Sequence, residues 1–166
     1  MGDDQARETD LGHALLRHTV ATVAYRGGKA LRGAPADFSA FRAKDGSRSA
    51  GEILAHIGDL FDWGLSIAEG RHEWREHGPQ TWDRDVERFF AVIGRFDTRL
   101  ASGIPLACRA EQLFQGPIAD ALTHVGQIAL LRRLAASPVR AENYFKAAIA
   151  VGRTGPEQSA PRQEFD

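Results

Sequence analysis

The chain has 166 residues, with 21 basic and 22 acidic side chains and a formal net charge of −1. This length fits one domain that buries a substantial core, and the balanced charge leaves no field to hold nucleic acid or an anionic membrane surface. We therefore expect a single domain over 1–166, with its core at about 8–136 and a C-terminal extension over 137–166.

Cysteine content and hydropathy predict the compartment. Cys108 is the only cysteine, so no intramolecular disulfide can form and a reducing compartment is expected. Residues 1–10 are polar and acidic, unlike a signal peptide, and no apolar run approaches the ~18 residues of a membrane-spanning helix. These features predict a cytoplasmic protein.

Apolar residues return at three- and four-residue intervals in four windows, which predicts four long helices. The first covers about 8–32 and ends either at Gly27-Gly28 or at Gly33. Its inward stripe consists of Leu11, Leu15, His18, Thr22 and Tyr25. Turn residues over 34–48 predict a long crossover loop after this helix.

The second predicted helix has the clearest start in the chain. Ser49 and Glu52 form a capping box, and an apolar stripe continues to Gly70, where a polar run begins. The third predicted helix covers about 82–101 and has the most regular apolar ridge.

The fourth predicted helix begins near Gly116-Pro117, because proline suits a first helical turn, and ends near Ala136. A short helix at 141–150 follows, and the tail from Gly152 either wraps the surface or frays. Together these elements predict an all-α four-helix bundle with a long first loop and a C-terminal extension.

Two of the predicted helices carry residue types that bind divalent metals. Asp120 and His124 are four residues apart and so lie on one face of a helix, while His56 lies beside the apolar stripe of another. Such a set suits zinc, nickel, iron or manganese and leaves coordination positions open. The alternative is that both histidines are hydrogen-bonded core residues and Asp120 is a carboxylate favoured by the helix start.

Helical spacing also predicts supporting residues. Asp59 follows His56 by three positions, and Gln127 follows His124 by three, so each could orient an imidazole or else serve as a surface or helix-contact residue. Trp63 lies on an inward stripe, as Tyr25 does, and could line a pocket or only pack.

Other candidates fail on geometry. His72 and His77 are five residues apart, which places them on different sides of a helix, so we interpret them as part of a solvated helix end. Cys108 has no basic cluster nearby to activate a thiolate. No catalytic residue is assigned from the sequence.

Residues 47–57 and 124–134 resemble the second- and fourth-helix signatures of DinB/YfiT-like bundles, and the order of the helices is similar over about 8–136. The resemblance implies a divalent metal held by one histidine of the second helix and a His-x-x-x-His pair of the fourth. His56 and His124 match two of these positions, and Asp120 stands where the family usually has its other histidine. A carboxylate there shifts the preference from zinc towards iron, manganese or nickel.

The resemblance further implies a metal-dependent hydrolase, or a transferase that uses a low-molecular-weight thiol, acting on a small-molecule substrate. The alternative is a non-enzymatic bundle that serves as a stress-associated binding or interaction protein. In either case we expect a homodimer, because an apolar bundle face can pair with a two-fold mate.

Overall fold

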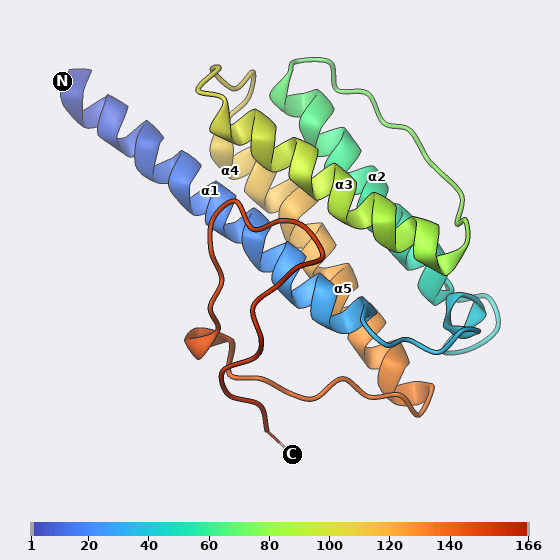
Figure 1. The fold of residues 1–166 in the computed structure, drawn as a ribbon. Helices are drawn as coiled ribbons and strands as arrows, with labels where there is room; N and C mark the ends of the chain where they lie inside the picture. The colour runs from blue at the N-terminus through green and yellow to red at the C-terminus, as the bar shows by residue number, and fades with distance from the viewer. Residues whose placement is uncertain (1, 166) are drawn as a thin grey trace.

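Helices form all the regular secondary structure between residues 2 and 165, the part of the chain that this computed structural model describes, with side chains described from residue 11 onward. The long elements are α1 (Gly2–Leu31), α2 (Ala50–Ala68), α3 (Trp82–Ala101) and α5 (Ala119–Leu134), as Figure 1 shows. Shorter turns are η1 (Phe38–Ala40), α4 (Ala110–Leu113), the π-helical η2 (Phe114–Ile118) and η3 (Tyr144–Lys146). The predicted all-α class is confirmed.

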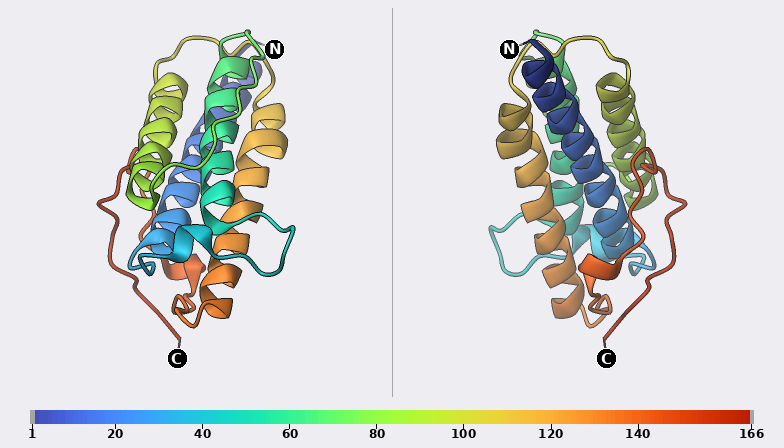
Figure 2. Two further views of the ribbon diagram at one scale, coloured as in Figure 1. Left: turned by 90° about the vertical axis from the view of Figure 1, so that its right-hand side faces the viewer. Right: turned by 90° about the vertical axis from the view of Figure 1, so that its left-hand side faces the viewer.

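The helices pack side by side in a ring. Helix α2 packs against α3 and α5, and α1 packs against the same two helices from the other side. Helices α2 and α3 point in the same direction, opposite to α1 and α5 (Figure 1). The chain over 69–81 must therefore return along the whole length of α2 before α3 can begin (Figure 2). Within the described residues, no helix is both long and apolar enough to cross a membrane.

The inward stripe of α1 differs from the predicted one, of which only Tyr25 is buried. Leu11 and Leu15 are 70% and 68% exposed, whereas Leu16, Val20 and Val23 are buried against the other helices. Both stripes repeat every three to four residues, so periodicity alone does not distinguish them. The buried stripe is the one that meets α3 and α5.

Close packing explains why α1 continues through Gly27-Gly28. A Cβ atom at Gly27 would overlap the ring of Phe89 on α3, so the glycine permits a close approach of two helices instead of ending one. The helix ends after Leu31, and Gly33 has a φ of +64°, a left-handed conformation typical of a residue just past a helix. The second of the two predicted ends is confirmed.

The buried guanidinium of Arg132 joins the ends of α1 and α5. Its side chain donates hydrogen bonds to main-chain oxygens of Ala30, Arg32, Gly33 and Ser137. These include carbonyls at the end of α1, which have no partner within their own helix. Arg132 is only 4% exposed, and burial lowers its pKa.

The predicted start of the fourth helix is wrong. The chain is already helical at Ala110, and Pro117 lies inside the π-helical η2 instead of in a first turn. Proline lacks an N–H and its ring excludes the carbonyl four residues earlier, so a widened turn lets the helix continue through it. Gly64 of α2 faces Pro117, and a Cβ atom there would lie 3.1 Å from the proline ring.

The C-terminal extension wraps the surface of α1, as one of the two predicted alternatives has it (Figures 1 and 2). Glu142 is buried and accepts hydrogen bonds from Tyr25 at 2.7 Å and from Lys29 at 2.8 Å. Lys29 also pairs with Glu164 at 2.7 Å, and Glu142 and Glu164 form an isolated antiparallel bridge. Ion pairs therefore fasten this extension.

The predicted helix at 141–150 is wrong. Only Tyr144–Lys146 forms a single 3-10 turn, and Phe145 within it is 97% exposed. An isolated helix of about ten residues is unstable without an apolar partner surface. Here the main chain pairs with residues 163–165 instead, through hydrogen bonds at Asn143 and Phe165.

Replacing Arg132 with methionine is expected to lower the free energy of unfolding by about 2–4 kcal/mol, because several buried carbonyls lose their donor. Urea denaturation measures the change. Arg133→Met is the matched control, since Arg133 is exposed on the same turn of α5. Equal stability of the two variants would contradict this role of Arg132.

Gly27→Ala is expected to destabilise the fold by about 1–3 kcal/mol, because the added methyl group overlaps the Phe89 ring in a packed core. Gly126→Ala on α5 is the control. Nothing lies within 4 Å of a Cβ atom at Gly126, so its higher helix propensity should stabilise the protein by up to about 1 kcal/mol. Thermal unfolding of both variants checks the opposite signs.

Candidate metal centre

The candidate site lies between α2 and α5, where His56 faces Asp120 and His124 across the helix contact. The predicted capping box sets the start of α2. Ser49 Oγ accepts a hydrogen bond from the Glu52 N–H at 3.2 Å, and Glu52 accepts one from the Ser49 N–H at 2.6 Å. Since the helix begins at a defined residue, the face that His56 occupies is defined as well.

The three side chains bring their ligand atoms together. His124 Nε2 lies 3.3 Å from Asp120 Oδ1, and His56 Nε2 lies 4.0 Å from Asp120 Oδ2. One ligand atom of each residue lies within 4.8 Å of the others, and the two imidazole centroids are 4.8 Å apart. Four ligands at about 2.1 Å from a tetrahedral ion are about 3.4 Å apart, so small side-chain movements would complete such a site.

Exposure differs between the two kinds of ligand. The His56 and His124 side chains are 18% and 12% exposed, whereas the Asp120 side chain is 48% exposed. The imidazoles therefore lie on the protein side of the cluster and the carboxylate on the solvent side. Burial lowers the pKa of His56, with Arg48 and His124 acting in the same direction, and the neutral imidazole is the form that binds metal.

Gln127 lies next to His124, as the helical spacing predicts. Its Oε1 atom is 2.8 Å from His124 Nδ1, so it can accept the Nδ1–H hydrogen bond. The Nε2 lone pair of the same imidazole then points towards Asp120. Outer hydrogen bonds of this kind fix the tautomer of a metal-binding histidine.

Asp59 has partners other than the imidazole that the spacing predicts. It is 1% exposed, and it accepts hydrogen bonds from the His77 main-chain N–H at 3.1 Å and from Arg88 Nη2 at 2.7 Å. His77 Nδ1 also lies 2.8 Å from Asp59 Oδ1. Asp59 therefore holds the α2–α3 crossover and α3, and its described hydrogen bonds do not include His56.

The segment that carries His72 and His77 is an extended crossover, not the predicted helix end. Residues 71–80 are all exposed, as predicted for a solvated segment. The sequence offers no local signal for the contact of His77 with Asp59, because the two residues belong to different elements.

Two tryptophans adjoin the cluster. The Trp74 ring centroid lies 5.7 Å from that of His56, and Trp63 lies 5.9 Å from Trp74, both in edge-on arrangements. Trp63 was one of the residues predicted to line a pocket or to pack, and it is half-buried beside the core. Trp74 was missed, because only the path of the crossover brings it to α2.

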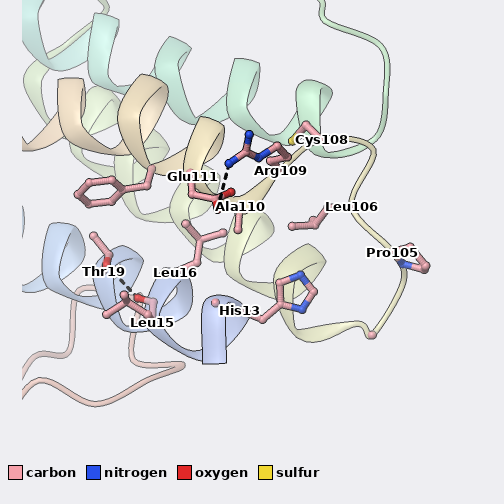
Figure 3. Close-up of a pocket in the computed structure, with 13 residues that line it drawn as sticks. His13, Leu15, Leu16, Thr19, Pro105, Leu106, Cys108, Arg109, Ala110 and Glu111 are labelled. Carbon is pink, nitrogen blue, oxygen red and sulfur yellow. Dashed lines mark hydrogen bonds and ion pairs between the residues drawn. The ribbon is translucent and has the colours of Figure 1, made fainter. Parts of the chain in front are cut away.

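A separate groove of about 920 Å³ opens between α1 and residues 103–114 (Figure 3). Leu15, Thr19, Leu106 and Cys108 are among its lining residues, and the three candidate ligands are not. Burial raises the pKa of the Cys108 thiol, although Arg99 opposes the shift, which disfavours the nucleophilic thiolate. Tyr25 lies under the C-terminal extension, where it bonds to Glu142.

Among the residues with described side chains, His56, Asp120 and His124 are the only group of three or more histidine, cysteine or acidic side chains close enough to share an ion. No protein-family model, curated protein or solved structure matches this chain. The DinB/YfiT-like resemblance therefore stays a prediction, and the chemistry of the site depends on its own geometry.

Proposed function

We propose that the protein binds one divalent metal ion through His56, Asp120 and His124 and uses it to act on a small molecule. The observation that carries the proposal is the convergence of three ligand atoms from α2 and α5 within 4.8 Å, with the carboxylate on the solvent side. Three protein ligands leave coordination positions for water or substrate, as in catalytic sites.

The reaction class we propose is that of a metal-dependent thiol transferase or hydrolase. A divalent ion lowers the pKa of a bound water or thiol and so supplies a nucleophile near neutral pH. The residues of this chain hold the ion. His56 and His124 coordinate it from the more buried side, Gln127 orients the His124 imidazole, and Asp120 adds a negative charge at the open side.

The fold assignment belongs to the same proposal. The ring of α1, α3, α2 and α5 supports a four-helix bundle of the DinB/YfiT-like kind, since facing helices of such bundles commonly supply metal ligands to a shared centre. Because Asp120 replaces the usual histidine, we propose manganese, iron or nickel ahead of zinc.

Metal content of untagged protein, purified without chelator and then loaded with each ion in turn, tests the proposal. We expect about one equivalent per chain in the wild type. His124→Ala should lose more affinity than the roughly 10- to 100-fold typical of removing a supporting residue around a metal site.

His72→Ala is the control for this loss, because His72 is exposed on the crossover and belongs to no ligand cluster in the described part of the chain. It should bind like the wild type. Substoichiometric metal in the wild type, or equal binding by the wild type and His124→Ala, would overturn the proposal in favour of a non-enzymatic bundle. In the metal-loaded protein, thiol-consumption assays and ester and amide substrates separate transferase from hydrolase.

Asp120→His is expected to raise the affinity for zinc relative to manganese, because imidazole is a softer ligand than carboxylate. Competition titrations of the two ions measure the ratio. Asp120→Asn is the control for charge: it should weaken both ions without reversing their order. An unchanged zinc-to-manganese ratio in Asp120→His would show that residue 120 does not touch the ion.

A further inference from the structure

The candidate ligands share one seam with both neighbouring tryptophans. His56 and Trp63 are seven residues apart on α2 and so lie on the same face of that helix. On the opposite helix, Asp120 faces His56. Gly116, one turn before Asp120, lies next to Trp63, because a Cβ atom at Gly116 would be 3.9 Å from the Trp63 ring. A molecule that enters this seam towards the ion therefore meets indole rings.

Trp74 is held between two anchor points on α2. Ser66 Oγ accepts a hydrogen bond from the Glu73 N–H at 3.0 Å, directly before Trp74. Buried Asp59 accepts one from the His77 N–H at 3.1 Å, three residues after it. Trp74 is thus positioned before any ligand arrives, although the crossover itself is exposed.

One side of Trp74 remains free for a ligand. The residue is 45% exposed even though its ring packs edge-on against His56 and Trp63. The side chain of Asp120, the third candidate ligand residue facing His56, is similarly exposed. An aromatic group that packs on the free side of Trp74 therefore lies next to His56, one of the candidate ligands.

Charge selects among the ligands that indole rings attract. Two neutral imidazoles and one carboxylate leave a divalent ion with a formal charge of roughly +1. An anionic donor atom neutralises this charge, whereas an organic cation is repelled by it. Aromatic groups bind indole rings through stacked or edge-on contacts. The favoured ligand therefore combines an aromatic group with an anionic donor.

We propose that Trp74 and Trp63 are specificity-determining residues of the metal site, and that its substrate carries a flat aromatic group next to an anionic metal-binding atom. Arenethiolates and arenecarboxylates are examples of this class. The inference rests on the proposed metal-binding function and adds the class of substrate to it.

A pair of probes with the same metal-binding group tests the inference. Benzohydroxamate and acetohydroxamate both bind through the hydroxamate and differ in a phenyl or methyl group, so their affinity ratio reports on the surroundings of the ion. In the metal-loaded full chain, we expect Trp74→Leu to reduce the preference for benzohydroxamate roughly two- to tenfold, the usual effect of one aromatic contact. Trp63→Leu should act in the same direction.

Trp82→Leu is the matched control, since Trp82 begins α3 and packs against Phe38, with ring centroids 5.2 Å apart. It should leave the affinity ratio unchanged. Metal content and thermal unfolding are measured on the same samples, so that loss of fold or of metal is recognised directly.

The outcomes separate the two proposals. If Trp74→Leu keeps its metal and the wild-type affinity ratio, the indole pair does not select substrates, while the metal site stands. If Trp74→Leu loses its metal, Trp74 positions His56 and the specificity role is overturned. If the wild type binds no metal, both proposals fail.

Discussion

Helices α2 and α3 are neighbours that run parallel to each other, and the rest of this structure depends on this constraint. Arg88 of α3 holds the pair together. Its guanidinium lies over Gly58 of α2, where a Cβ atom would be 2.6 Å from Nη1, and it donates to the Ala55 carbonyl and to the carboxylates of Asp59 and Asp62. The Arg88 side chain is only 16% exposed, and a largely buried cation that loses such partners is costly, so the pairing is specific. Because α3 starts beside the start of α2, the connecting chain has to run along α2, and that path brings Trp74 against His56 and His77 against Asp59.

Buried polar side chains fasten the other ends of the molecule in a similar way. Arg132 satisfies carbonyls at the end of α1 from a position on α5, and Glu142 joins the C-terminal extension to Tyr25 and Lys29 of α1. Apolar burial drives the helices together but has little directional preference. Directional hydrogen bonds to buried charged groups are stronger than neutral ones and define which helix ends and loops meet.

The division between two partly buried imidazoles and an exposed carboxylate supports the functional proposal. His56 and His124 are held on the core side of the seam. Burial favours the neutral form of His56, and Gln127 orients the His124 ring. Asp120 lies towards solvent, and Trp74 of the crossover packs against His56 and against Trp63 of α2. The groove near Cys108 (Figure 3) is lined by other residues, and none of the three candidate ligands is among them.

The sequence by itself determined the features that depend on residues close together in the chain. The capping box at Ser49, the bounds of α3, and the shared face of Asp120, His124 and Gln127 all depend on contacts within about one helical turn, which local pattern encodes. Only the tertiary structure decided which stripe of α1 is buried, since Leu15 and Leu16 both belong to apolar repeats and the partner helices select one. It likewise decided that the helix continues through Pro117 in a π-helical turn, that the 141–150 segment pairs with the chain end instead of forming a helix, and that Asp59 binds His77 and Arg88. Each of these outcomes depends on residues far apart in sequence, whose meeting is set by packing and by the pairing of buried polar groups.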